Sequence, residues 1–217
     1  MSEVFDCADP TRRSRGLTAA VDALKAGRLV VMPTDTVYGI GADAFDGSAV
    51  EALLRAKGRG RDMPVGVLVG SWYTIEGLVY GLPDGARDLV RAFWPGALSL
   101  VVRQAPSLHW DLGDAQGTVM LRMPLHPVAV ELLREVGPMA VSSANVSGQP
   151  AAVDADAARR QFGDLVDVYL DAGPAAQQAA STIVDLSGAS PRILREGPVS
   201  TQQVADVLGV DASGLLG

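Results

Sequence analysis

The chain has 217 residues, of which 48% are hydrophobic and 20% are charged, enough apolar material for one substantial core. Its single cysteine, Cys7, excludes an internal disulfide and any cysteine-rich metal cluster. The formal charge of −7 opposes a general nucleic-acid-binding surface. Neither a signal peptide nor a membrane-spanning apolar run is recognisable, so the sequence predicts a soluble, cytoplasmic protein with no membrane association.

Short β-branched runs alternate with segments of helical period along the chain. The sequence predicts strands over residues 28–33, 64–70, 97–102, 118–124, 138–143, 166–170, 181–186 and 191–195. It predicts helices over residues 18–27, 48–57, 85–94, 126–136, 154–166 and 200–209, with Asp154 and Ser200 at N-cap positions. Because several strands are apolar throughout, we expect an α/β fold with a mixed, largely parallel sheet covered by helices.

Hydroxyls and glycines gather in residues 33–41, directly after the strand expected over residues 28–33. Ligands of α/β proteins usually bind where strands end, and glycines let backbone amides approach an anion. Thr34 and Thr36 add hydroxyl donors. A turn held by Asp35 explains the same residues equally well. The segment lacks the Gly-Lys-Ser/Thr ending of a P-loop, which excludes that nucleotide motif.

The apolar stripe of the helix expected over residues 48–57 is continued at helical spacing by Lys57, which should therefore point inward. Its ammonium then either snorkels along the edge of the core or enters a polar cleft. The next residues, Gly58-Arg59-Gly60-Arg61, end the helix and place several cations on a flexible, glycine-containing loop. Such a cluster suits a polyphosphate, and it equally suits a solvated helix C-terminus favoured by the helix dipole.

Arg122 interrupts an otherwise apolar strand. Strand alternation places it on the same face as Thr118 and Met120. An arginine in such a run needs a carboxylate or phosphate partner, because burying it unpaired is costly. A salt bridge within the protein meets that need as well as a ligand does.

A second loop of hydroxyls, an amide and a glycine follows another strand, over residues 142–148. No histidine or acid accompanies its serines in a triad-like motif, which argues against a hydrolase nucleophile. The two histidines, His109 and His126, lie apart and lack further nitrogen or sulfur ligands, so zinc is not expected. The loosest stretch, residues 173–181, is either a surface connection or a loop that closes over a ligand.

These motifs together resemble the YrdC-like threonylcarbamoyl-adenylate synthase family, whose product is used to modify tRNA. The resemblance rests on PTDTVYGIG, KGR, WPGALSLVV, TVMLRMP, SSANVSG, STIVD and RILREG, which occur in the family's order. It covers roughly residues 19–199, which we expect to form a single YrdC-like catalytic domain. Residues 1–18 are then an N-terminal tail, and residues 200–217 a C-terminal helix and tail.

The resemblance implies a twisted, mixed sheet wrapped by helices around a positively charged concave cavity that holds ATP and L-threonine. Matching the motifs residue by residue assigns L-threonine binding to Thr36, Arg122, Ser143 and Ser181. The same match assigns ATP binding to Lys57, Arg59, Thr118, Asn145 and Arg195, of which Lys57 and Arg59 are expected to matter most. Polar contacts usual in the family are in doubt at Gly60, Met63, Leu68 and Val153, and Ser142 replaces a proline.

The implied reaction joins L-threonine, bicarbonate and ATP into threonylcarbamoyl-AMP and pyrophosphate, by positioning and charge neutralisation rather than a covalent enzyme intermediate. Mg²⁺ is expected with ATP, and the sequence names no protein ligands for it. Downstream tRNA-modifying proteins are the implied partners, while direct contact with tRNA stays open. Two alternatives remain: a non-catalytic module that binds structured RNA, and a carbamoyl-handling relative with another acceptor.

Overall fold

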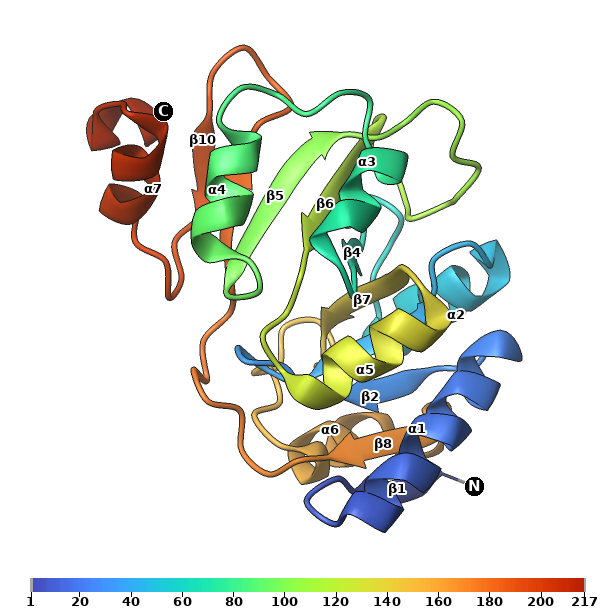
Figure 1. Cartoon of the computed structure of the whole chain (residues 1–217). Helices are drawn as coiled ribbons and strands as arrows, with labels where there is room; N and C mark the ends of the chain where they lie inside the picture. The colour runs from blue at the N-terminus through green and yellow to red at the C-terminus, as the bar shows by residue number, and fades with distance from the viewer. Residues whose placement is uncertain (1, 217) are drawn as a thin grey trace.

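The computed structural model describes residues 2–216, which form a ten-stranded sheet in the order β1-β8-β2-β3-β7-β4-β6-β5-β9-β10 (Figure 1). The strands are β1 (Glu3–Asp6), β2 (Val30–Met32), β3 (Gly39–Asp43), β4 (Gly66–Leu68), β5 (Leu98–Arg103), β6 (Thr118–Arg122), β7 (Met139–Ser143), β8 (Val168–Asp171), β9 (Thr182–Asp185) and β10 (Arg192–Arg195). The expected α/β fold with a mixed sheet is confirmed, and so are all eight expected strands.

Helices flank the sheet. They are α1 (Pro10–Lys25), α2 (Gly47–Lys57), α3 (Ile75–Leu78), α4 (Ala86–Phe93), α5 (Pro127–Val136), α6 (Ala155–Phe162) and α7 (Thr201–Leu208), with single 3₁₀ turns at Trp72–Thr74, Gly163–Leu165 and Ala212–Leu215. Both expected N-caps are present: Asp154 accepts from the Ala157 amide at 2.6 Å, and Ser200 forms a capping box with Gln203. No helix within residues 2–216 is both long and apolar enough to cross a membrane.

The expectation of a largely parallel sheet needs correction. Among the strand pairings of residues 2–216, four are parallel (β1–β8, β2–β8, β4–β6 and β5–β9). Five are antiparallel (β2–β3, β3–β7, β4–β7, β5–β6 and β9–β10). A strand that is apolar throughout is buried on both faces. Helices on both sides of a mixed sheet bury its strands in the same way, so the apolar pattern does not reveal whether strands run parallel or antiparallel.

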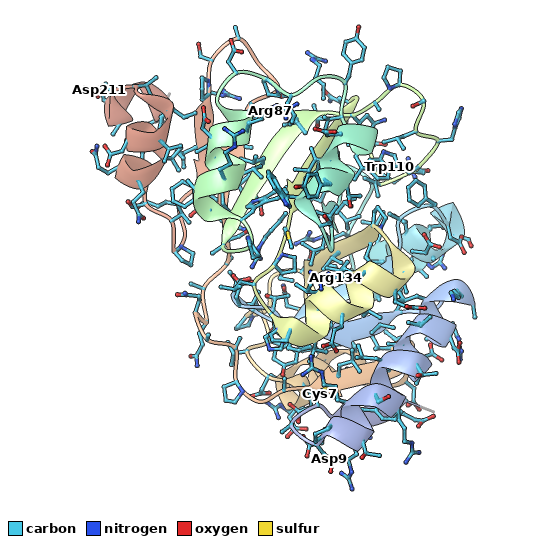
Figure 2. The ribbon with its side chains drawn as sticks, viewed as in Figure 1. Cys7, Asp9, Arg87, Trp110, Arg134 and Asp211 are labelled. Atoms are coloured by element: carbon cyan, nitrogen blue, oxygen red, sulfur yellow. The ribbon has the colours of Figure 1, made fainter. Side chains whose placement is uncertain are left out.

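The N-terminal segment differs from the expected tail over residues 1–18. Strand β1 pairs in parallel with β8 at the sheet edge, and α1 begins at Pro10 behind its N-cap Asp9. Cys7, labelled in Figure 2, is buried just after β1. Residues 1 and 217, at the ends of the two expected tails, lie outside the described residues.

Two apolar clusters hold the helices on the sheet. In the smaller one, Val21 and Leu24 of α1 and Leu132 of α5 pack against strand residues such as Val30 and Met139. Helices α1 and α5 contact each other and lie side by side in Figure 1. The larger cluster collects buried side chains of α2, α4, α6 and α7 together with strand residues such as Val31 and Ala140, whose strands also contribute to the smaller cluster. Burying such side chains contributes about 1.5–3 kcal/mol each relative to exposure.

The segment that joins β8 to β9 crosses from the second to the ninth position of the sheet (Figure 1, orange). It contains the stretch over residues 173–181, which was expected to be loose. Backbone bonds tether it: the Ala175 amide donates to the Val153 carbonyl at 2.7 Å, and the Gln177 amide donates to the Asp35 carbonyl at 3.1 Å. The crossing segment is thus attached to the loop between β2 and β3.

Gly70 offers a test of the packing between β4 and α5. A Cβ atom there would lie 2.8 Å from both the Leu133 carbonyl carbon and the Arg134 amide nitrogen, which are helix backbone and cannot move aside cheaply. We predict that Gly70→Ala lowers the free energy of unfolding by about 1–3 kcal/mol, measured by urea denaturation.

The matched control is Gly77→Ala in α3, where an added Cβ meets nothing within 4 Å. That variant should be neutral or slightly more stable, because alanine loses less backbone entropy in a helix than glycine. Equal effects at both positions would contradict the packing argument.

Candidate functional site

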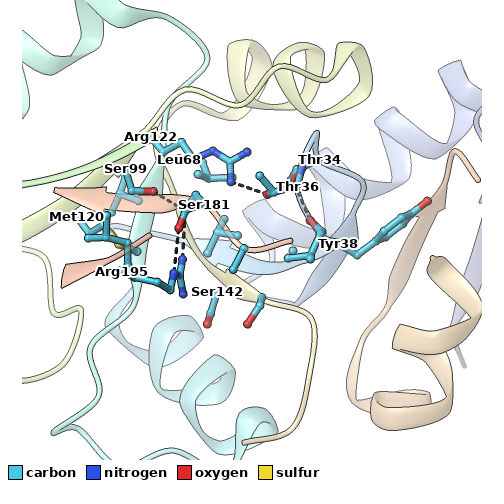
Figure 3. Close-up of a pocket in the computed structure, with 18 of the residues that line it drawn as sticks. Thr34, Thr36, Tyr38, Leu68, Ser99, Met120, Arg122, Ser142, Ser181 and Arg195 are labelled. Atoms are coloured by element: carbon cyan, nitrogen blue, oxygen red, sulfur yellow. Dashed lines mark hydrogen bonds between the residues drawn. The ribbon is translucent and has the colours of Figure 1, made fainter. Parts of the chain in front are cut away.

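A cavity of about 280 Å³ lies on the sheet between the β2–β3 loop and strands β4, β6, β7 and β9. It falls near the lower end of the roughly 300–1,000 Å³ usual for small-molecule sites. Its lining includes hydroxyls from Thr34, Thr36, Ser99, Ser142, Ser143 and Ser181, and apolar side chains from Leu68, Met120 and Ile183. Figure 3 shows these side chains converging from strands that lie far apart in the sequence.

Three arginines, Arg59, Arg122 and Arg195, are the charged side chains that line the cavity, and no carboxylate lines it within residues 2–216. Arg59 and Arg195 make no ion pair with the described residues, whereas Arg122 pairs with Asp35, which lies behind the cavity wall. The positive charge of the cavity as a whole stays a prediction.

Arg122 is 7% exposed, and its guanidinium is held at three points. Its Nε donates to the Gly96 carbonyl at 2.8 Å, Nη1 to Thr36 Oγ1 at 2.8 Å and Nη2 to Asp35 Oδ1 at 2.7 Å. Burial lowers the pKa of Arg122, and the Asp35 carboxylate opposes that shift. The need for a partner, expected from the strand pattern, is confirmed, and within the protein the partner is Asp35.

Arg59 and Arg195 contact neutral oxygen atoms. Arg59 donates from Nη1 to Ser142 Oγ at 3.1 Å and from Nε to Ser147 Oγ at 3.2 Å. Arg195 donates to the Ser181 carbonyl at 2.9 Å and to Ser181 Oγ at 3.2 Å, as Figure 3 shows. Burial lowers the pKa of both arginines. Because hydroxyls and carbonyls carry no net charge, these two cations are available to an anion.

Lys57 points inward, as its helical spacing predicts, and its side chain is fully buried. Its ammonium donates to the carbonyls of Ser143 and Asn145, the latter at 2.7 Å, beneath the loop that follows β7. The Ser147 amide donates back to the Lys57 carbonyl at 2.8 Å. Gly58 ends the helix with φ at 63°, as expected of a glycine in that place.

The expected site residues therefore separate into two groups. Thr36, Arg59, Arg122, Ser143, Ser181 and Arg195 line the cavity, whereas Lys57, Thr118 and Asn145 do not. Asn145 Oδ1 accepts from Ser143 Oγ at 2.6 Å, so it adjoins a lining residue. Thr118 starts β6 and donates to the Ala115 carbonyl at 2.7 Å, on the side of the sheet that carries Met120 and Arg122.

The sequence did not single out Ser99 as a site residue. Its hydroxyl lies 2.9 Å from Ser181 Oγ inside the cavity. The signal available was a lone hydroxyl within the apolar run over residues 97–102. The hydroxyl of a buried serine in a strand can donate its hydrogen bond to a nearby carbonyl, so a lone serine does not by itself indicate a ligand.

Comparison with known proteins now decides the family. The Sua5/YciO/YrdC family model, described as "Telomere recombination", matches residues 22–197. The chain belongs to the Sua5/YciO/YrdC family. A protein of Mycobacterium tuberculosis named "Putative threonylcarbamoyl-AMP synthase" is 79% identical over all 217 residues, covering 100% of each chain.

Two solved structures show the same architecture. The crystal structure of Pyrococcus abyssi Sua5 complexed with L-threonine matches with a TM-score of 0.89 and 31% identity, over 96% of this chain and 61% of that chain. Escherichia coli YciO matches with a TM-score of 0.80 over 100% of both chains, and at 21% identity this likeness concerns the fold alone.

The departures from the family pattern lie in different surroundings. Leu68 lines the cavity, and Ser142 uses its hydroxyl to accept from Arg59. Met63 is 42% exposed and lies outside the cavity, as do Gly60 and Val153. Ser142 is therefore the departure that touches a charged lining residue.

The residues present do not fit a protein-held metal. Within residues 2–216, no three histidine, cysteine, aspartate or glutamate side chains gather closely enough to hold one. Asp35, which pairs with the lining residue Arg122, already accepts two hydrogen bonds. This absence concerns a metal held by protein side chains alone; Mg²⁺ usually keeps several waters and binds together with substrate phosphates.

Lys57 makes the stability of the fold depend on pH. Burial, followed by the charge of Arg59, lowers the pKa of Lys57 from 10.5 to about 7. Between these values the unfolded chain holds a proton that the folded chain has released, so the free energy of unfolding rises with pH. We predict that wild-type stability, relative to the non-titrating Lys57→Met, increases from about pH 7 toward about pH 10, with a slope of at most about 1.4 kcal/mol per pH unit.

The measurement is urea denaturation at several pH values, with Lys25→Met as the control because Lys25 is exposed. The wild-type and Lys25→Met curves should run parallel. A pH-independent difference between wild type and Lys57→Met would mean that the two carbonyls keep the buried ammonium protonated throughout.

Proposed function

We propose that this chain is an L-threonylcarbamoyladenylate synthase, a nucleotidyltransferase that converts ATP, L-threonine and bicarbonate into threonylcarbamoyl-AMP and pyrophosphate. The observation that carries the proposal is the full-length, 79% identity to mycobacterial proteins named "Putative threonylcarbamoyl-AMP synthase". The cavity agrees with it, because it offers arginines and hydroxyls for anionic, hydroxylated ligands.

We infer that L-threonine binds at the side of the cavity formed by Thr36, Arg122, Ser143 and Ser181. Arg122 supports this because it lines the cavity with a guanidinium whose orientation is already set. Arginine recognises a carboxylate through paired N–H donors, which a single ammonium cannot reproduce. The nearby hydroxyls of Thr36 and Ser181 suit the polar groups of an amino acid.

We infer that ATP binds beside Arg59 and Arg195, which form no ion pair with residues 2–216. Lys57 and Asn145 adjoin this side through the loop after β7. Because its amino group is bonded to two carbonyls, we infer that Lys57 serves the nucleotide chiefly by holding that loop. It adds positive charge only below its pKa of about 7. Thr118, at the start of β6, lies outside the cavity lining, and we infer that it faces a nucleotide that extends along the strand.

The chemistry needs positioning more than proton transfer. The threonine amine attacks bicarbonate-derived CO₂ to form a carbamate, and a carbamate oxygen then attacks the α-phosphorus of ATP while pyrophosphate leaves. Fixed arginines neutralise the phosphate charge, and aligned reactants lower the entropic part of the barrier. We infer that Mg²⁺ comes with the phosphates of ATP, since the cavity lining contains no carboxylate.

The product would supply tRNA threonylcarbamoyladenosine modification through downstream proteins, in the cytoplasm. The net charge of −7 disfavours tRNA as a direct ligand of the whole surface.

The direct test incubates the purified chain with ATP, bicarbonate and each amino acid in turn, and follows pyrophosphate release and the adenylate by mass. L-threonine should give threonylcarbamoyl-AMP. Pyrophosphate released with another acceptor would indicate a carbamoyl-handling relative, and no release with any acceptor would indicate a binding module.

Arg59 and Arg61 provide a matched pair for the nucleotide assignment. Arg59 lines the cavity, whereas Arg61 is exposed and pairs with Asp111 and Asp114. We predict that Arg59→Ala raises the KM for ATP by about tenfold or more, because a charge-assisted contact is worth roughly 1.5–3 kcal/mol. Arg61→Ala should leave it within about twofold.

Pyrophosphate release at saturating threonine and bicarbonate measures both values, and thermal melts check folding. If Arg59→Ala melts early but keeps a normal KM for ATP, Arg59 is structural. Equal losses in both variants would point to a general charge effect instead.

A further inference from the structure

Asp35 lies at the junction of three segments, although it is not one of the side chains that line the cavity. Its Oδ1 accepts from Arg122 Nη2 at 2.7 Å and from the Leu125 amide at 2.8 Å. Its backbone carbonyl accepts from the Gln177 amide of the crossing segment at 3.1 Å. Asp35 is 8% exposed, so these bonds form largely out of reach of solvent.

The guanidinium of Arg122 has five N–H donors. Three are engaged, by the Gly96 carbonyl, Thr36 Oγ1 and Asp35 Oδ1. One N–H on Nη1 and one on Nη2 therefore donate no hydrogen bond to the described residues. Arg122 lines the cavity, and these two donors sit on the two nitrogens that a carboxylate engages end-on.

We propose that Asp35 is a positioning residue, whose Oδ1 fixes the rotation of the Arg122 guanidinium so that two free N–H donors face the threonine carboxylate. This inference rests on the proposed function, because it takes threonine as the ligand of Arg122. Asp35 touches no substrate. It acts through Arg122, and the Leu125 amide in turn holds Oδ1 in place.

A purely structural ion pair is the competing explanation. Such a pair would need the charge of Asp35, to compensate a buried arginine, and would tolerate changes in the position of its oxygen. A positioning role needs the oxygen in its place and tolerates loss of the charge. Arg195, whose charge acts on Arg122, is the same in every Asp35 variant. Burial lowers the pKa of His126 and the Asp35 charge opposes that shift, so Asp35→Asn also lowers the His126 pKa, whereas Asp35→Glu keeps the opposing charge.

Two substitutions separate these requirements. Asp35→Asn keeps an oxygen at Oδ1 for both donors and removes the charge, and it costs no hydrogen bond because Oδ2 makes none to the described residues. Asp35→Glu keeps the charge and moves the oxygen by one methylene. Asp35→Ala is less informative, since it leaves a buried arginine unpaired and endangers folding.

The experiment measures threonine affinity by calorimetry without ATP, the KM values for threonine and ATP, and the melting temperature. Asp35→Asn should bind threonine within about threefold of wild type while melting earlier. Asp35→Glu should weaken threonine binding by about tenfold or more, because small misplacements of an orienting group cost that much, with the KM for ATP within about threefold. Asp185→Ala, which removes a carboxylate paired with Arg192 outside the cavity, should match wild type in affinity.

The opposite pattern, with normal affinity in Asp35→Glu and weak affinity in Asp35→Asn, would overturn the positioning role in favour of charge. Normal affinity in both variants would overturn it as well. Calorimetry also separates this inference from the proposed function. If the wild-type protein binds threonine but forms no adenylate, the proposed function is refuted and the role of Asp35 is not. Wild type without affinity for threonine would refute Arg122 as its site, and the role of Asp35 with it.

Discussion

The buried ion pair between Arg122 and Asp35 is the constraint on which the site depends. The two residues are 87 positions apart, and their contact ties the loop after β2 to the end of β6 across the middle of the sheet. Removing two charges from water is expensive, and attraction alone does not compensate for it. Here, further bonds from the Leu125 amide, Thr36 and the Gly96 carbonyl complete the polar neighbourhood. The same bonds that make the pair tolerable also orient it.

Lys57 solves the same problem differently. It is more deeply buried than Arg122, yet its acceptors are two neutral carbonyls rather than a carboxylate. Its charge is therefore solvated by the protein but not cancelled. The loop over residues 143–147 is held by Lys57 at three points: the ammonium donates to the carbonyls of Ser143 and Asn145, and the Lys57 carbonyl accepts from the Ser147 amide. Burial lowers the pKa of Lys57 to about 7, so the charge is present below that pH, where a cation that does not line the cavity contributes to the field inside it.

Local chemistry made much of the fold predictable from the sequence. The spacing after Val50 and Leu53 correctly placed Lys57 inside, and Asp154 and Ser200 start their helices as capping residues should. Strand β3 was missed because its sequence, GIGAD, resembles a loop. Its glycines serve packing instead: a Cβ at Gly39 would lie 2.9 Å from Val141 Cγ1. A glycine selected for close approach of neighbouring strands is indistinguishable, in sequence, from one selected for a turn.

The residue types of the candidate site were predictable from the sequence, but the contacts between them were not. The strand pattern required a partner for Arg122, and only the fold brings Asp35 to it. Strand order was likewise beyond reach, because antiparallel and parallel pairs with both faces covered have the same apolar pattern. Ser99 was overlooked since one hydroxyl in a strand carries no information about the strand beside it. These are contacts between distant segments, which local propensity does not encode.

The arginines that line the cavity differ in how their charge is compensated. Arg122 is paired with the Asp35 carboxylate, so the pair has little net charge but still presents directed N–H donors. Such donors suit a single carboxylate, which is recognised by its shape. Arg59 and Arg195 are held by hydroxyls and a carbonyl, so their full charge is available, and burial strengthens its effect by lowering the local dielectric. Uncompensated charges of this kind suit a ligand with several negative charges. A reaction that joins a small amino acid to a nucleotide needs both kinds of arginine and no nucleophile. The cavity's inventory of arginines and hydroxyls, without a nucleophile and base in contact, is what such a reaction requires.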